Sequence, residues 1–282
     1  MNSFAFVALA LALCCAGPTE ALPRRKSAVT WVPTPIGSTP NTCVHQVPAG
    51  SSVRELPDEK LAVRTAGGSI YALAACTLSR INATASRVQR SAVGAPFSGW
   101  LSFATSQSAD LLGYDHFRGS LRAPNLPREP PPELFLSVGT QNQAWLPLAN
   151  STATRPRGPF NFFGISLRYP ASTSAWALGV WFATAASGTV YTTERNVEAG
   201  QRVDFHMQRT DTQTWMAKAT VRETGEYVQL QVSNPCLAVQ AWAAMGVAGA
   251  GLQRCSQLHR GDWELSEVQL LGDDKVQSLP WV

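Results

Sequence analysis

Apolar and polar residues alternate in short runs over most of the chain between residues 96 and 272. In residues 202–208 and 227–232, every second residue is apolar and those between are polar or charged. A period of two places the apolar side chains on one face of a β-strand, so these runs predict strands with one buried face.

Similar runs predict a series of strands, and turn-forming sequences at 199–201, 223–226 and 260–262 separate several of them at hairpin spacing. No segment keeps a long 3.6-residue period. Because each half-buried sheet needs another apolar face to cover it, the pattern predicts an all-β, two-sheet antiparallel sandwich. The predicted strands are 100–103, 117–121, 134–138, 162–167, 176–183, 202–208, 215–223, 227–232, 238–245 and 263–271.

The rest of the chain divides into shorter segments. Residues 43–78 hold short β-type runs between Gly-containing turns and predict a small β unit. The Pro-rich residues 22–42 predict an extended lead-in. The polar residues 79–95 predict an interdomain linker or a processing region, residues 96–272 form the predicted sandwich, and residues 273–282 are a C-terminal tail.

The N-terminus has the features of an export signal. Residues 5–16 form an apolar run of a length that is too short to span a bilayer and typical of a signal-peptide core. We expect residues 1–21 to be removed, leaving a secreted, extracellular protein with no membrane segment. Lipidation at Cys14 or Cys15 in a bacterial export route remains an alternative.

Removal of the signal leaves four cysteines: Cys43, Cys76, Cys236 and Cys255. An even number in an oxidising compartment predicts two disulfides. Four cysteines allow three pairings, of which sequence proximity favours Cys43–Cys76 and Cys236–Cys255. No two of them have zinc-site spacing and the histidines are dispersed, so we expect neither a metal nor another cofactor.

The charge distribution and the glycosylation sequons limit the classes of binding partner that the sequence indicates. The formal net charge is +4 and the basic residues are scattered, which does not indicate nucleic-acid binding. Asn82 and Asn150 begin Asn-X-Ser/Thr sequons, which would be glycosylated in a eukaryotic source. We expect a monomeric glycoprotein.

Several stretches of the main domain carry a family resemblance: Ser98-Gly-Trp100, Tyr114–Pro124, Phe135–Gly139, Gly164–Leu167 followed by Trp176 and Trp181, and residues 197–205 leading into 215–231. In this order they resemble the eqolisins, the glutamic peptidase family. The segment from Cys43 to Pro48 is similar to one found ahead of some eqolisin-like sandwiches. The resemblance implies a concanavalin A-like β-sandwich.

The resemblance also implies a catalytic pair, a Glu as general acid/base and a Gln that stabilises the oxyanion. The matching positions hold Phe162 and Ala241, and no Asp or Glu occurs between Glu226 and Asp262. A loop rearrangement could bring Gln141 or Gln143 near the first position and Gln240 near the second, but an amide has no titratable proton. The pattern therefore favours a pseudoenzyme.

Aromatic and amide side chains are the candidates for a binding face. Trp176, Trp181 and Trp242, with Tyr191 and Trp215 as further candidates, could form a platform for sugar rings or peptide side chains. Hydrogen bonds would come from Gln229, Gln231 and Gln240. Equally, the rings could fill the inter-sheet core and the amides could lie on solvated strands.

Three functions therefore remain open. The first is a secreted, non-catalytic sandwich that binds carbohydrate or peptide on its concave face. The second is an acid-active glutamic endopeptidase with a displaced catalytic pair, in which residues 22–90 would be a prosegment. The third is a structural extracellular protein.

Overall fold

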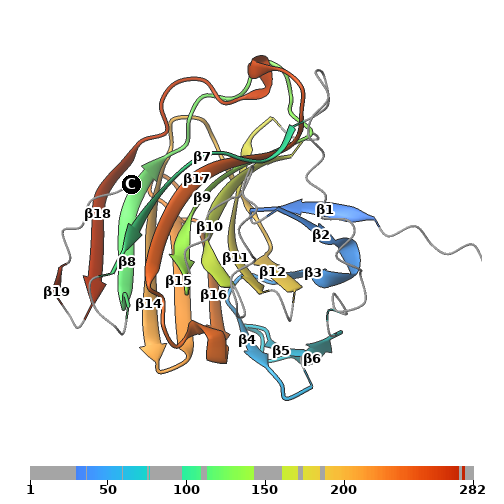
Figure 1. Cartoon of the computed structure of the whole chain (residues 1–282), viewed down its shortest axis with the longest axis vertical. Coiled ribbons are helices and arrows are strands. Elements are labelled where there is room, and N and C mark those ends of the chain that lie inside the picture. Colours follow the sequence, from blue (N-terminus) through green and yellow to red (C-terminus); the bar gives the residue numbers. More distant parts are fainter. Residues whose placement is uncertain are drawn as a thin grey trace, which may run out of the picture. The chain divides into compact units, whose positions relative to one another are not determined.

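Two large β-sheets face each other across one apolar core in the computed structural model, which confirms the predicted sandwich (Figure 1). The structure describes residues 30–35, 37–58, 60–74, 76, 97–108, 113–142, 161–170, 174–184, 188–272 and 275–276. The described strands belong to one compact unit, Trp31–Val282.

The first sheet has the strand order β3-β12-β11-β10-β9-β17-β7, and β13 also pairs with β11. Its strands are β3 (Val44–Val47), β7 (Phe97–Gln107), β9 (Glu133–Gln141), β10 (Asn161–Pro170), β11 (Trp176–Thr184), β12 (Gly188–Thr192), β13 (Arg195–Val197) and β17 (Trp242–Leu252).

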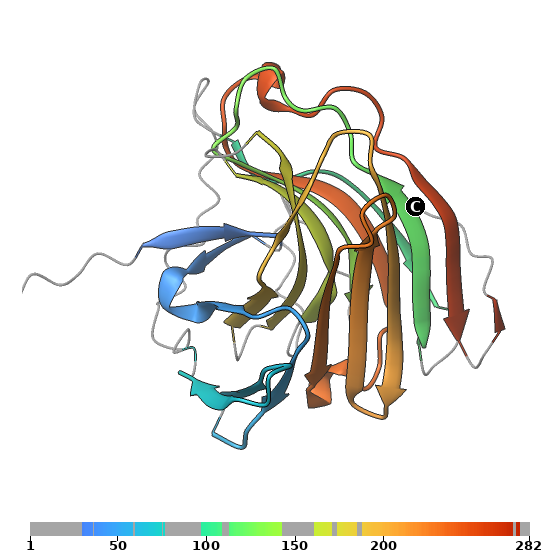
Figure 2. The ribbon, with the colours of Figure 1, turned by 180° about the vertical axis from the view of Figure 1, so that it is seen from behind.

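The second sheet has the order β19-β18-β8-β14-β15-β16-β4-β5-β6 and forms the other layer, seen from behind in Figure 2. Its strands are β4 (Ser51–Glu55), β5 (Leu61–Arg64), β6 (Ile70–Leu73), β8 (His116–Arg122), β14 (Arg202–Asp211), β15 (Thr214–Val221), β16 (Tyr227–Ser233), β18 (Leu265–Gly272) and β19 (Lys275–Val276). Three short 3₁₀ turns, η1 (Asn41–Cys43), η4 (Pro235–Leu237) and η5 (Cys255–Gln257), join strands.

The core lies between the two inner faces. In β14 the alternating Val203, Phe205 and Met207 are buried against it, as the period of two predicted. In β9, β10 and β11, by contrast, almost every residue is buried on both faces. These central strands therefore lack the regular alternation of β14.

The N-terminal strands are part of the sandwich, whereas the sequence predicted a separate small unit at 43–78. β3 pairs in parallel with β12 of the first sheet, and β4 pairs in parallel with β16 of the second. The chain passes between the sheets at residues 48–50, where Gly50 has a positive φ of 81°. Without these pairings, β12 and β16 would be edge strands with unpaired backbone groups on one side, and β3 and β4 supply the hydrogen-bond partners. The sheets are therefore mixed, where an antiparallel sandwich was predicted.

Part of the predicted lead-in also has regular structure. β1 (Trp31–Thr34) and β2 (Gly37–Pro40) form a separate antiparallel hairpin. The Thr34 hydroxyl donates a hydrogen bond to the Gly37 carbonyl oxygen over 2.5 Å. The φ of Gly37 is +117°, a conformation that side chains disfavour, so this glycine permits the turn.

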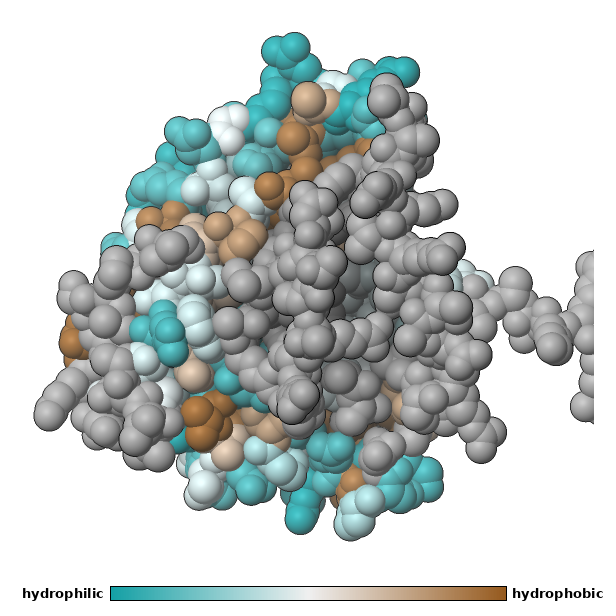
Figure 3. Space-filling view, viewed as in Figure 1, coloured by the Kyte–Doolittle hydropathy of each residue, from teal (hydrophilic) through white to brown (hydrophobic). Residues whose placement is uncertain are grey.

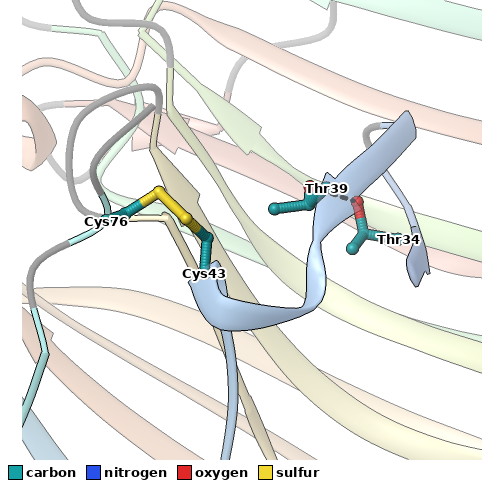
Figure 4. The surroundings of a disulfide bond; sticks show 4 residues. All are labelled: Thr34, Thr39, Cys43 and Cys76. Carbon is teal, nitrogen blue, oxygen red and sulfur yellow. Dashed lines mark hydrogen bonds between the residues drawn. A yellow bond between two sulfur atoms is a disulfide. The ribbon is translucent and has the colours of Figure 1, made fainter. Parts of the chain in front are cut away.

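The predicted Cys43–Cys76 disulfide is confirmed (Figure 4). Both cysteines are buried beside Gly188, at the start of β12. A Cβ atom on Gly188 would lie 2.5 Å from the Cys43 carbonyl oxygen. The bridge therefore fixes the start of β3 against the strand with which it pairs.

The predicted Cys236–Cys255 disulfide is wrong, because both thiols are free. Cys236 precedes β17 and Cys255 follows it. An extended strand of this length spans about 33 Å, at roughly 3.3 Å per residue, whereas bridged cysteines have Cα atoms within about 7 Å. The two cysteines are close in sequence but far apart in space, because a whole strand, β17, separates them.

Several predictions fall outside the described residues: the signal peptide at 1–21, the sequons at Asn82 and Asn150, the linker at 79–95 and most of the tail at 273–282. No helix among the described residues is long and apolar enough to cross a membrane. Within the same residues, no three His, Cys, Asp or Glu side chains are grouped so that they could hold a metal ion.

Candidate functional site

The first sheet has a second face, turned away from the core, which we call the outer face. Strand register arranges its side chains in rows that cross β17, β9, β10 and β11. The rows are Trp242–Gln141–Phe162–Ala183, then Ala244–Gly139–Gly164–Trp181, then Gly246–Ser137–Ser166–Gly179, then Ala248–Phe135–Arg168–Ala177.

Small residues in the middle of these rows form a floor on which aromatic rings lie. A Cβ atom on Gly139 or Gly164 would come within 2.8 Å of the Phe162 ring. Phe162 packs with Phe135, Trp181 and Ala248 in an apolar cluster separate from the inter-sheet core. The glycines are therefore required because the ring occupies the space above them.

Two further aromatic contacts extend this cluster. The Trp181 and Tyr191 rings stack with centroids 4.4 Å apart and planes 10° apart, and we call them the ring pair. The Phe135 ring meets Trp181 edge-on at 5.7 Å. Trp181 is only 2% exposed, whereas Tyr191 is half-buried. Tyr191 is therefore the partly accessible member of the pair.

The row that contains Phe162 includes the first position that the family resemblance matched to a catalytic residue. Its neighbour Gln141 is 1% exposed, and the Gln141 Oε1 atom accepts no hydrogen bond. On β17 the side chain in this row is Trp242, not Ala241, which precedes the strand. The residue of β17 that pairs with Gln141 therefore carries an indole.

Charged groups lie at the other end of the outer face and form what we call the charged cluster: Arg168, Glu133 and Glu194. Arg168 donates from Nε to Glu194 Oε1 over 2.7 Å, from Nη2 to Glu194 Oε2 over 2.5 Å, and from Nη1 to Glu133 Oε1 over 3.0 Å. All three side chains are between 12% and 24% exposed. The cluster is thus partly accessible to solvent.

Burial and charge set the protonation of this cluster. Burial raises the pKa of Glu133, and Arg168 opposes that rise. Burial by itself would lower the pKa of Arg168, but its bonds to Glu194 and the charges of both carboxylates raise that pKa above its ordinary value. Burial also raises the pKa of Tyr191, which senses all three charges. The ring pair and the charged cluster are therefore neighbours.

The indole Nε1 of Trp181 is a buried donor without an acceptor. A Cβ atom built on Gly179 would lie 3.2 Å from this nitrogen and 3.3 Å from Glu194 Cγ. The absence of a side chain at 179 thus lets the indole N–H lie close to the charged cluster.

Of the predicted ring platform, Trp181, Trp242 and Tyr191 lie on the outer face. Trp176 is fully buried in the inter-sheet core, and its Nε1 donates to the Pro124 carbonyl oxygen over 2.9 Å. Trp215 is buried there too, with Nε1 bonded to the Leu237 carbonyl oxygen over 3.0 Å.

The predicted amides do not join that face. Gln229 and Gln231 lie on the solvent side of the second sheet, opposite Lys218 and Met216 of β15. Gln240 is fully buried before β17 and donates to the Cys236 and Val239 carbonyl oxygens over 3.3 and 3.1 Å. Their separation follows from strand register, which sequence alone did not supply.

The sequence analysis missed the charged cluster. Arg168 is the one charged residue in the apolar run Asn161–Pro170, and that isolation is the signal that could have indicated it. Its partners come from β9 and from the residues after β12, so only the paired sheet brings the three together.

Glu133 lies too far from Gln141 for the two side chains to contact each other. Glu133 and Gln141 lie on the same strand, eight residues apart, which is about 26 Å at 3.3 Å per residue. A general base must lie within hydrogen-bonding reach, about 3 Å, of the proton that it takes.

A separate cavity of about 460 Å³ lies at the strand ends of the second sheet. Its lining includes Arg122, Arg260, Asp262 and Glu264, all exposed. The Arg260-Gly-Asp262 segment forms its rim as a turn in which Gly261 has a positive φ of 78°. Among its described lining residues the charges are mixed and none is aromatic, unlike on the outer face.

Exposed large apolar side chains include Leu101 and Phe103 on β7, of which Phe103 pairs with Gly246 of an outer-face row, and Tyr227 on β16 of the second sheet. The surface in the view of Figure 3 mixes hydrophilic residues with a hydrophobic strip near the top of that view.

Solved structures of a glutamic peptidase, a lectin and an agglutinin are similar to part of the chain. The solved structures that match include scytalido-glutamic peptidase with a transition-state-analogue inhibitor, at 13% identity and TM-score 0.45, covering 65% of this chain and 84% of that one. Basic winged bean lectin with Tn-antigen matches at 12% identity and TM-score 0.31, over 63% of this chain and 78% of the lectin. A homodimeric agglutinin from chicken liver matches at 12% identity and TM-score 0.29, over 60% of this chain and 100% of the agglutinin.

No protein-family model matches the chain. No curated protein matches it either.

Proposed function

We propose that the protein is a secreted β-sandwich that binds carbohydrate or peptide on the outer face and catalyses no reaction there. One observation carries the proposal. The row expected to hold a catalytic Gln and Glu holds Phe162, Gln141 and Trp242. These rings and this amide lack the titratable group that acid/base catalysis needs near the reacting bond.

The Cys43–Cys76 disulfide supports the extracellular location, because such bonds form and persist in oxidising compartments. The combination of aromatic rings with partly exposed Arg168, Glu133 and Glu194 supports binding, because the rings supply apolar contact and the charged groups supply hydrogen bonds.

A thermal-shift screen against neutral saccharides and short peptides tests the proposal. A compound that binds only the native state, at one hundred times its dissociation constant, adds about 2.7 kcal/mol to the free energy of unfolding. At roughly 2–4 °C per kcal/mol, the midpoint should rise by about 5–11 °C. Failure of every compound in both panels to raise it would contradict binding.

Casein digestion at acidic pH tests the non-catalytic part. We expect no cleavage above that of a buffer control. Cleavage that disappears in the Glu133→Gln or the Glu194→Gln variant would show a displaced peptidase centre and would refute this part of the proposal.

A further inference from the structure

We infer that the outer face binds a saccharide rather than a peptide, and that Tyr191 and the charged cluster hold it. This inference rests on the proposed function and names its ligand class. Three features of the face carry it: the pairing of its strands, the balance of its charges and the geometry of its rings.

The first feature is the saturation of the backbone. β9 pairs with β10 and β17, and β10 pairs with β9 and β11. β11 pairs with β10 on one side and with β12 and β13 on the other. A peptide that adds to a sheet uses free backbone groups at an edge strand, and these central strands offer none. Recognition must come from side chains.

The second feature is the mixture of charges. Arg168 lies between Glu133 and Glu194, so an anionic group meets two carboxylates and a cationic group meets a guanidinium. A neutral polyol is not repelled by either sign. Three N–H groups of Arg168 serve the ion pairs, and the other two, with Glu133 Oε2, remain outside these contacts. Hydroxyl groups, which both donate and accept, fit that mixture.

The third feature is the ring pair. Tyr191 stacks on Trp181 through one face of its ring, and the phenol is half-buried. The accessible part of this ring is a flat apolar surface of the kind against which the C–H groups of a sugar ring pack. Backing by Trp181 fixes the orientation of the phenol, so little conformational freedom is lost on binding.

The indole N–H of Trp181 reports on the same place. Its nitrogen is buried, and the space left by Gly179 brings it close to Glu194. A saccharide held by Tyr191 and the charged cluster would therefore change the surroundings of this N–H without contacting it.

An array of neutral mono- and oligosaccharides beside an array of hexapeptides tests the inference, with isothermal titration of the strongest array compound. We expect saccharide binding. Tyr191→Ala and Glu194→Gln should each weaken it about tenfold or more. Tyr227→Ala and Glu226→Gln are matched controls outside the outer face, and both should bind as the unchanged protein does.

Thermal midpoints separate loss of a contact from loss of the fold. If Glu194→Gln lowers the midpoint strongly, the binding assay uses the Arg168→Lys variant instead. Lysine keeps the positive charge but cannot form the two-pronged contact with the carboxylate. Peptide binding without saccharide binding overturns this inference and leaves the proposed function standing. Binding of neither class overturns both. Saccharide binding that survives Tyr191→Ala unchanged refutes the location.

Discussion

Removal of the disulfide is a quantitative test of how the N-terminal strands are held. The bridge joins residues separated by 33 positions, and both cysteines are buried where the edge strand β3 pairs with β12. In the chain-entropy account, closing a loop of this length stabilises the folded state by about 4 kcal/mol. The double variant Cys43→Ser with Cys76→Ser should lose that amount.

Urea unfolding, followed by tryptophan fluorescence, measures the loss as a difference in the free energy of unfolding. The thermal midpoint should fall by about 8–16 °C, at roughly 2–4 °C per kcal/mol. Cys255→Ser is the control, because this thiol is free and exposed and its replacement should change the free energy by less than about 0.5 kcal/mol. A loss below about 1 kcal/mol in the double variant would show that β3 and β12 stay paired without the bridge, and would refute the reasoning.

Three further predictions concern other residues. Burial raises the pKa of the Cys236 thiol to about 12; iodoacetamide at about pH 8 should therefore label the exposed Cys255 and spare Cys236 until urea is added, as peptide mass mapping would show. Burial lowers the pKa of His206 below 6.5, so the unfolded chain takes up a proton first as pH falls. The free energy of unfolding should therefore be full above that pH and decline below it, and the decline should be less steep in His206→Gln. Urea titrations at several pH values that give the same decline for both proteins would contradict this. In Gly164→Ala the new Cβ would meet a carbonyl oxygen of β9 at 2.3 Å, so unfolding should need roughly 1–3 kcal/mol less, whereas Gly67→Ala, with 3.9 Å of room, should change little; equal effects would be the contrary result.

The strands of the second sheet could be predicted from the sequence because one of their faces is wet. The run 202–208 alternates and lies within β14. The central strands of the first sheet are buried on both faces, so their apolar runs located them but could not assign a face. That is why Trp176 and Trp181, on the same strand, looked equivalent, although one belongs to the core and the other to the outer face.

The candidate site was harder to predict because it depends on register between strands distant in sequence. Arg168 and Glu133 pair across neighbouring strands, and Glu194 reaches them from the end of β12. The parallel pairing of β3 with β12 has no local signal in the sequence either, because a hairpin turn indicates only that the two strands it joins are antiparallel neighbours. Alternation along a strand predicts which residues share a face. Which residues of different strands touch depends on the register between those strands.

The indole N–H resonances of the nitrogen-15-labelled protein test the central claim most directly. The chain has nine tryptophans, and the Trp181→Phe variant identifies the signal of Trp181 by its loss. On addition of the saccharide that the array binds most strongly, the Trp181 signal should move. The signals of Trp176 and Trp215, whose N–H groups bond to carbonyls in the core, should stay in place. A saturating saccharide that leaves Trp181 unmoved would contradict binding at the outer face.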